Sequence, residues 1–289
     1  MTVYSQGSDE RLGRYQFGEP IHAGNMSRVY RAQDTDNGEV VALKRPSKDD
    51  PSHLARFKEE AQIHQGLVHP AIVRQLSHGG STFADAYILM EWLDGPTLDQ
   101  RLASGPLGLS DALILAQRTA EALSFVHREQ VVHRDLKPAN LLLCEGLAAK
   151  TKLIDFGIAR RQSPAGLSVH ATFAGGSWAY MSPEQAMGSA ELGARADVYG
   201  LGCVLFEAIS GSAAFPSDRA RAVVAKVWQP PPNLADFCED VPQPLLTLVS
   251  RMLATDPSLR PKDGGALLSE LLRVGKLPDA PAKPRARGC

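Results

Sequence analysis

The most constraining feature of this chain is the stretch from Val131 to Gly157, in which short apolar runs alternate with polar loops. Two apolar runs, at 131–132 and 141–143, enclose a loop rich in ionisable and amide side chains. A third apolar run, at 153–154, leads directly into an acidic residue. Short strands beside a polar loop can hold such side chains rigidly near one point. The pattern therefore predicts an organised charged site.

The residue types in this stretch suit phosphoryl transfer. Asp135 and Asp155 supply carboxylates, Asn140 supplies an amide and Lys137 supplies a cation. One acid can orient a hydroxyl nucleophile, the second acid and the amide can bind Mg²⁺, and the lysine can neutralise the moving phosphoryl group. Each residue alone would be an ordinary polar loop residue, so the prediction rests on their joint order and spacing.

The segments His-Arg-Asp-Leu-x-x-x-Asn at 133–140 and Asp-Phe-Gly at 155–157 resemble the catalytic-loop and metal-binding motifs of the protein kinase family. The resemblance extends over about residues 15–275. It implies an α+β fold with two lobes and ATP in the cleft between them. We expect a small five-stranded antiparallel lobe with one helix at 15–93, and a larger, mainly α-helical lobe at 96–275.

The two ends of the chain lack such patterns. Residues 1–14 are polar and carry no periodicity, so we expect a flexible leader. Residues 276–289 are proline-rich and basic, which is typical of a linker or a disordered end. Whether this tail leads into a further domain stays open.

The first lobe departs from the family pattern at one turn. Where the family has Gly-x-Gly-x-x-Gly, this chain has His-Ala-Gly-Asn-Met-Ser at 22–27, so Gly24 alone is retained. A side chain at His22 restricts the backbone and would crowd a nucleotide. Lys44, at the end of Val-Ala-Leu-Lys, resembles the lysine that grips the α- and β-phosphates. By resemblance, Glu60 on a predicted helix at 52–66 pairs with it.

The resemblance also implies the remaining contacts to ATP. Met90 would close the back of the adenine pocket, and residues 91–93 would offer backbone groups to the adenine edge. Asn140 and Asp155 would hold Mg²⁺, with Mn²⁺ as an alternative. The residues assigned to the cofactor are Ile21, Gly24, Val29, Ala42, Lys44, Met90, Glu91, Leu93, Asn140, Leu142 and Asp155.

The catalytic residues follow from the same resemblance: Asp135, Lys137, Lys44 and Glu60. Asp135 would accept or orient the proton of the substrate hydroxyl. Lys137, in Asp-Leu-Lys-Pro, resembles the lysine that marks Ser/Thr kinases. Arg134 precedes Asp135, as in kinases that respond to a charged activation loop, which we place at 158–182. Candidate phosphosites in that loop are Ser163, Ser168 and Thr172.

Downstream segments are predicted to support the site. Residues 176–185 resemble the Gly-Thr-x-x-Tyr-Met-Ala-Pro-Glu-Gln segment of bacterial, eukaryotic-like (Hanks-type) Ser/Thr kinases. By resemblance, Glu184 pairs with Arg260 as a structural strut, and Asp197 holds the backbone of the catalytic loop.

Four further expectations concern the helical lobe. A helix is predicted to begin with Ser110 as its N-cap and to end near His127. We interpret His127 as a packed residue at the helix end, and His133 as a structural residue beneath Phe156. The buried stripe of the helix is Leu113, Ala116, Ala120, Leu123 and Val126.

Composition narrows the function classes. With 289 residues, 44% of them hydrophobic, and a formal net charge of −1, the chain can bury a core but gives no basic footprint for nucleic acid. Its four cysteines lack CxxC spacing, which favours reduced thiols. No apolar run approaches the ~20 residues of a membrane span, and no signal-peptide core opens the chain. We therefore expect a soluble cytoplasmic protein unless the chain is a fragment.

Our prediction is a non-specific Ser/Thr protein kinase that transfers the γ-phosphoryl group of ATP to protein hydroxyls, including those of a second copy of itself. Three alternatives stay open. The altered turn at 22–27 fits a pseudokinase scaffold or a nucleotide-binding module. A small-molecule kinase would share the catalytic residues, although residues 176–184 resemble a platform for a protein substrate. The chain could also be the kinase part of a larger signalling regulator.

Overall fold

A computed structural model describes residues 10–24, 26–157, 159–161, 177–189, 192–275 and 283–284. The candidate phosphosites Ser163, Ser168 and Thr172 lie outside these residues. The chain divides into two compact units, the first comprising Met1–His69 and Val73–Asp94 and the second Pro70–Ile72 and Gly95–Cys289. The boundary after Asp94 coincides with the Asp-Gly-Pro break in the sequence.

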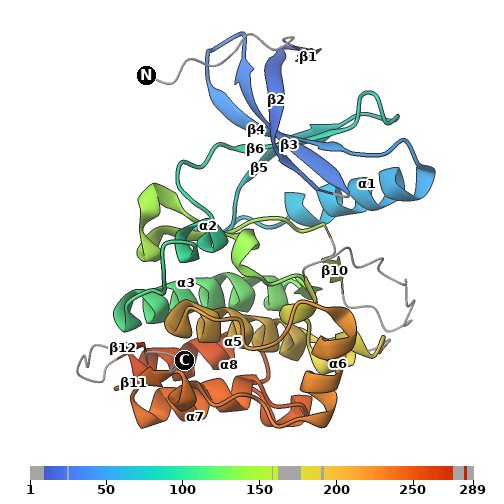
Figure 1. Ribbon diagram of the computed structural model, residues 1–289. Helices are drawn as coiled ribbons and strands as arrows, with labels where there is room; N and C mark the ends of the chain where they lie inside the picture. Colours follow the sequence, from blue (N-terminus) through green and yellow to red (C-terminus); the bar gives the residue numbers. More distant parts are fainter. Residues whose placement is uncertain are drawn as a thin grey trace. The chain divides into compact units, whose positions relative to one another are not determined.

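The described residues of the first unit form one antiparallel sheet and one helix (Figure 1). The strand order is β1-β2-β3-β4-β6-β5, one strand more than the five expected. The additional strand, β1, lies within the segment that the sequence suggested as a leader, and Glu10 pairs with Phe17 of β2. The strands are β1 (Glu10–Leu12), β2 (Tyr15–Ala23), β3 (Ser27–Asp34), β4 (Val40–Pro46), β5 (Gln75–Gly79) and β6 (Tyr87–Glu91).

The two faces of this sheet differ because side chains alternate along each strand. One face forms a hydrophobic cluster of Tyr15, Phe17, Tyr30, Ala32, Val41, Leu43 and Leu89. Ile88, which alternates with Leu89, instead packs with Phe57 and Ala61 of α1 (Pro51–Gln65). The helix therefore belongs to the second face, which also carries Lys44.

Helix α1 has clear start and stop signals. The Asp50 carboxylate accepts hydrogen bonds from the amides of Ser52 and His53, and Pro51 occupies the first turn. The helix ends before Gly66. These caps fix where the helix begins, and hence which of its residues, among them Glu60, face the sheet.

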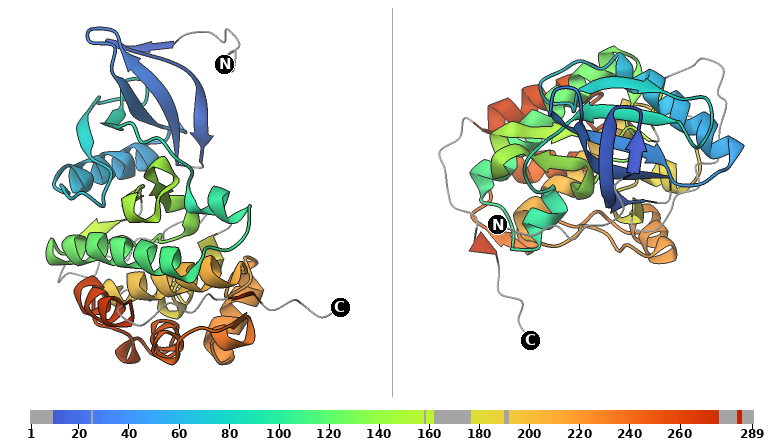
Figure 2. Two further views of the ribbon diagram at one scale, coloured as in Figure 1. Left: turned by 90° about the vertical axis from the view of Figure 1, so that its left-hand side faces the viewer. Right: turned by 90° about the horizontal axis from the view of Figure 1, so that it is seen from above.

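The second unit is mainly helical (Figure 2). Its central helix α3 packs against both α5 and α8, and α7 packs against α5 and α8. The helices are α2 (Leu98–Leu102), α3 (Leu109–Arg128), α4 (Pro183–Ala186), α5 (Ala194–Ser210), α6 (Arg219–Trp228), α7 (Gln243–Met252) and α8 (Gly264–Val274). Short 3₁₀ turns are η1 (Pro138–Asn140), η2 (Cys144–Gly146), η3 (Ala148–Lys150), η4 (Ser177–Ala179), η5 (Leu234–Asp236) and η6 (Pro257–Leu259).

Helix α3 begins earlier than the sequence suggested. Its N-cap is Gly108 and not Ser110, because the amide of Ala112 already donates to the carbonyl of Gly108. This start places Leu109 in the helix, where its side chain is buried. The predicted stripe is confirmed, since Leu113, Ala116, Ala120, Leu123 and Val126 are all buried.

Small strand pairs complete the second unit. β8 (Leu141–Leu143) pairs with β9 (Thr151–Leu153), and β7 (Val131–Val132) pairs with β10 (Arg160–Arg161). β11 (Cys238–Glu239) pairs with β12 (Lys283–Pro284). Gly95 approaches this region so closely that a Cβ atom would lie 2.0 Å from the Leu143 carbonyl oxygen, and its φ is +144°. Only glycine fits that position.

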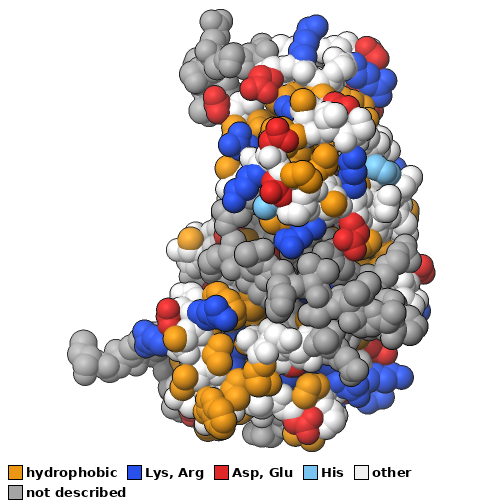
Figure 3. Space-filling view, turned by 90° about the vertical axis from the view of Figure 1, so that its right-hand side faces the viewer, with side chains coloured by type: hydrophobic (Ala, Val, Ile, Leu, Met, Phe, Trp, Pro, Cys, Tyr) orange, Lys and Arg blue, Asp and Glu red, His pale blue; other side chains and the backbone are white. Residues whose placement is uncertain are grey.

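Figure 3 shows that acidic and basic side chains are interspersed on the visible face of the first unit, with no large basic patch there. This distribution agrees with the formal net charge of −1. Among the described residues, no helix combines the length and apolar character that a membrane crossing requires.

Candidate active site

In the first unit, Lys44 and Glu60 form a buried ion pair. Lys44 ends the hydrophobic run of β4 and is 4% exposed, while Glu60 lies on the inward face of α1 and is 5% exposed. The Lys44 Nζ donates to the Glu60 Oε1. Glu59, the neighbouring acid, is exposed. The sequence therefore selected the glutamate that contacts Lys44.

Four of the residues assigned to the nucleotide share one face of the sheet. Ala42 lies opposite Met90, and Val29 lies opposite Lys44. Directly opposed residues of antiparallel strands project to the same face. These four side chains therefore line the face away from the hydrophobic cluster. On the connector, the Glu91 amide donates to the Arg74 carbonyl, so an adenine contact by Glu91 would have to use its carbonyl.

The turn between β2 and β3 places His22 at its edge. His22 is exposed, and its ring Nε2 would lie 3.4 Å from a Cβ atom at Gly24. Gly24 closes the turn by donating to the Ser27 carbonyl at 2.9 Å. Ile21 is 57% exposed, an unusual state for a large apolar side chain.

In the second unit, the loop after β7 fixes the Asp135 carboxylate. Its Oδ2 accepts from Lys137 Nζ at 2.6 Å and from Asn140 Nδ2 at 3.1 Å. The Asp135 amide donates to the ring Nδ1 of His133 at 3.3 Å. His133 is fully buried, and its ring meets Phe156 edge-on with centroids 5.0 Å apart. The expected packing of His133 against Phe156 is thus present.

Asn140 and Asp155 are brought together by the β8–β9 hairpin. The amide of Ile154 donates to the carbonyl of Asn140 at 2.9 Å, so Asp155 follows directly on that contact. Asp155 adopts the left-handed region, with φ +64°, which is uncommon for a residue other than glycine. Since Asn140 uses its amide nitrogen to contact Asp135, its side-chain oxygen is the group suited to a cation. An amide oxygen and a carboxylate are the hard ligands that Mg²⁺ prefers.

Asp197, in the first turn of α5, binds the backbone of the catalytic loop. Its Oδ2 accepts from the His133 amide at 2.8 Å, and its Oδ1 accepts from the Arg134 amide at 2.8 Å. His127 Nε2 contacts the same Oδ2 at 2.9 Å, while His127 Nδ1 accepts from the Gly264 amide. These partners assign the proton of a neutral His127 to Nε2. Burial alone would raise the pKa of Asp197, but the hydrogen bond and electrostatic interaction with His127 outweigh it, so the pKa lies below its ordinary value.

Asp197→Asn is expected to lower the free energy of unfolding by about 2–3 kcal/mol, because the side-chain NH2 of asparagine would replace one carboxylate oxygen and cannot accept from the N–H donor that faces it. Because the folded pKa lies below the ordinary value of 3.8, this stabilisation is complete above that value. It is lost as the pH falls through the folded pKa. Urea unfolding of the wild type and the variant at pH 7 would measure the first effect, and the same comparison at about pH 2 would measure the second. Asp218→Asn, at the exposed N-cap of α6, is the control, since asparagine caps a helix as well as aspartate.

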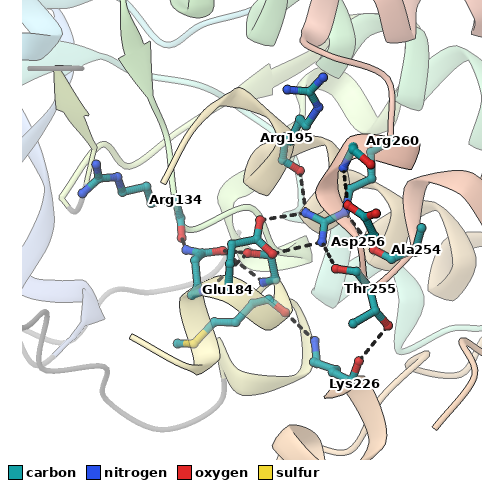
Figure 4. Close-up of polar contacts among 12 residues, drawn as sticks. Arg134, Glu184, Arg195, Lys226, Ala254, Thr255, Asp256 and Arg260 are labelled. Atoms are coloured by element: carbon teal, nitrogen blue, oxygen red, sulfur yellow. Dashed lines mark hydrogen bonds and ion pairs between the residues drawn. The ribbon is translucent and has the colours of Figure 1, made fainter. Parts of the chain in front are cut away.

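Glu184 and Arg260 form the predicted strut (Figure 4). Arg260 Nη1 and Nη2 bind the two carboxylate oxygens at 2.7 and 3.0 Å. The remaining donors bind the carbonyls of Ala254, Arg195 and Thr255. All five N–H groups of the guanidinium therefore have an acceptor. In Figure 4 the side chain of Arg134 points away from this cluster.

The comparisons with known proteins agree with this geometry. The profile of the protein kinase domain matches residues 15–272. The chain belongs to the protein kinase domain family. The kinase domain is 38% identical to "Serine/threonine-protein kinase PknB" of Mycolicibacterium smegmatis, over 93% of this chain and 44% of that protein. It is 37% identical to PknB of Mycobacterium tuberculosis, over 97% of this chain and 46% of that protein. It is 34% identical to "Serine/threonine-protein kinase PknA" of M. tuberculosis, over 94% of this chain and 64% of that protein.

The kinase domain thus spans less than half the length of the PknB relatives. The expected family and the two-part α+β fold are confirmed. Sequence reasoning missed two supports of the site: the bond between Tyr180 and Glu207, and the burial of Lys226. No spacing signal marked either, because each joins segments far apart in the chain.

Proposed function

We propose that the kinase domain transfers the γ-phosphoryl group of ATP to Ser or Thr hydroxyls of proteins. The observation that carries this proposal is the Asp135 carboxylate, held by Lys137 and Asn140 in one loop. A fixed carboxylate can orient the hydroxyl and take its proton, and the adjacent ammonium can stabilise the charge that moves to the phosphoryl group. The names of the relatives, all Ser/Thr-protein kinases, support the same substrate class.

For ATP, we assign the α- and β-phosphates to Lys44, oriented by Glu60. The adenine ring is assigned to the sheet face formed by Val29, Ala42 and Met90, with Ile21, Leu93 and Leu142 as further apolar contacts. The exposure of Ile21 supports this assignment, because an apolar ligand would cover it.

For the metal, Asn140 and Asp155 are the proposed ligands of Mg²⁺, with Mn²⁺ as an alternative. When bound, the cation supplies charge neutralisation for the phosphates. The backbone positions both proposed ligands. The Ile154 amide donates to the Asn140 carbonyl, and Asp155 follows in the left-handed conformation.

Phosphorylation of a second copy of the chain and a cytoplasmic location remain part of the proposal. Arg134, next to Asp135, is the group that we expect to bind a phosphate in the activation loop. Ser163, Ser168 and Thr172 stay candidate acceptor sites. Since the PknB relatives are about twice as long, we propose that the domain works within, or together with, a larger signalling protein.

Transfer from γ-labelled ATP with Mg²⁺ tests this proposal. We expect the wild type to label itself and a generic protein substrate. Asp155→Ala should label both at least about 10²-fold more slowly, because a metal ligand is lost. ATP should also raise the melting temperature of the wild type, because a bound nucleotide stabilises the folded state. Nucleotide binding without any transfer, with Mn²⁺ also tried, would instead favour the scaffold, a reading to which His22 beside Gly24 lends support. Label on a sugar or antibiotic alone would favour a small-molecule kinase.

A further inference from the structure

Lys226 is a lysine in an unusual place. It lies on α6, where Val224 and Trp228 are 49% and 79% exposed, yet Lys226 itself is 2% exposed. A buried ammonium is costly unless polar groups replace its hydration. A lysine that only improved solubility would be exposed. The burial of Lys226 therefore indicates a structural or functional role.

The groups that replace water are mostly neutral. Lys226 Nζ donates to the carbonyl oxygens of Ala179 at 2.8 Å and Met181 at 2.6 Å. The ammonium also lies 4.4 Å from the ring centroid of Phe215 and 5.0 Å from that of Tyr199. Cations are attracted to aromatic faces at such distances. Figure 4 shows Lys226 beside Thr255. The Thr255 hydroxyl donates to the Lys226 carbonyl at 3.1 Å.

The two carbonyls flank Tyr180, whose hydroxyl donates to Glu207 at 2.7 Å. Three side-chain bonds, from α6 and α5, therefore hold three consecutive residues of the segment before α4. The next residue, Ser182, caps α4. In that helix Gln185 Nε2 donates to the carbonyl of Arg134, immediately before Asp135. A continuous chain of contacts thus joins Lys226 to the catalytic loop.

We propose that Lys226 is a positioning residue for the protein substrate: it fixes the backbone at 179–181 as part of the substrate platform, and contacts neither ATP nor the reacting atoms. This proposal rests on the proposed function and on the resemblance of residues 176–184 to a platform for a protein substrate. Its consequence is a separation of effects. Loss of Lys226 should weaken binding of the protein substrate and leave binding of ATP nearly unchanged.

The ionisation of Lys226 gives a second consequence. Burial lowers the pKa of Lys226 to about 8. The groups that face it are Cys203 and Tyr199 from α5, Glu184 from α4, and Arg260, which is paired with Glu184. Burial raises the pKa of Cys203 to about 11, so its thiol is neutral near pH 8. As the pH rises through 8, Lys226 loses its charge. Its hydrogen bonds to the carbonyls of Ala179 and Met181 then weaken, because they are no longer charge-assisted.

Initial rates with myelin basic protein as the probe test the proposal, in wild type, Lys226→Met and Lys226→Arg. We expect Lys226→Met to raise KM for the protein about tenfold or more, with KM for ATP within about twofold, since charged hydrogen bonds are lost. Lys226→Arg should restore part of the loss because it keeps a cation with donors. Arg221→Met, an exposed basic residue on the same helix, is the control.

The pH profile and a measurement without catalysis complete the test. KM for the protein should rise above pH 8 in the wild type and stay flat in Lys226→Met. Hydrogen exchange of the amides at 177–184 should quicken in Lys226→Met. If Lys226→Met leaves KM for the protein unchanged, or raises both KM values in parallel, the inference about Lys226 is wrong while the proposed function stands. A wild type that transfers no phosphate to protein would reject the proposed function, and the inference with it.

Discussion

Asp135→Asn is expected to lower kcat for protein phosphorylation by about 10²–10⁴-fold, with little change in KM for ATP. The substitution keeps the size of the side chain but removes the charge that Lys137 and Asn140 hold in place. The amide cannot accept the proton of the substrate hydroxyl. The expected loss therefore falls on the chemical step and not on nucleotide binding.

Steady-state kinetics with ATP and protein varied separately would measure this loss. Asp236→Asn is a matched control, because Asp236 is an exposed residue of η5 outside the proposed site. A kcat within tenfold of the wild type would contradict the role of Asp135 as the proton acceptor. Retained thermal stability of the variant would show that the loss is not one of folding.

Arg260→Met is expected to lower the free energy of unfolding by about 3–5 kcal/mol, because it leaves a carboxylate without its partner in a site where the arginine side chain is fully buried. It also leaves the carbonyls of Ala254, Thr255 and Arg195 without this donor. Arg260→Lys should recover only part of the lost free energy of unfolding, since an ammonium cannot reproduce the planar, two-pronged hydrogen bonding of the guanidinium.

Chemical denaturation of the single variants and of Glu184→Gln/Arg260→Met would measure the coupling. The double variant should lose less than the sum of its parts, because no uncompensated carboxylate remains. Arg251→Met is the matched control, since Arg251 pairs with Glu270 at the surface, where the side chains are 44% and 27% exposed. Such an exposed pair should contribute less than about 1 kcal/mol. Equal losses in the two arginine variants would refute the strut.

The sequence could point to most of the candidate site because the motifs are local. His133 to Asn140 and Asp155 to Gly157 are short, ordered segments, and strands that flank them appear as apolar runs. Glu60 was separable from Glu59 by resemblance, and the structure shows the reason, since only Glu60 faces the sheet.

The failures share another cause, which is tertiary context. Ser110 is a good capping residue, but burial of Leu109 moves the start of α3 to follow Gly108. β1 is only three residues long and depends on pairing with β2. A lysine is normally exposed, and the sequence alone does not show that the carbonyls of Ala179 and Met181 and two aromatic rings surround the ammonium of Lys226.

The position of Asp197 has a consequence for how the domain can be regulated. One carboxylate in the first turn of α5 receives the amides of two consecutive catalytic-loop residues, His133 and Arg134, and is itself buried. These two points of the loop backbone are therefore fixed to the helix, and the amides of His133 and Arg134 should exchange with solvent only when the contact with α5 opens. We therefore expect control of activity to act on side chains or on other segments, and not by displacement of the backbone at His133 and Arg134.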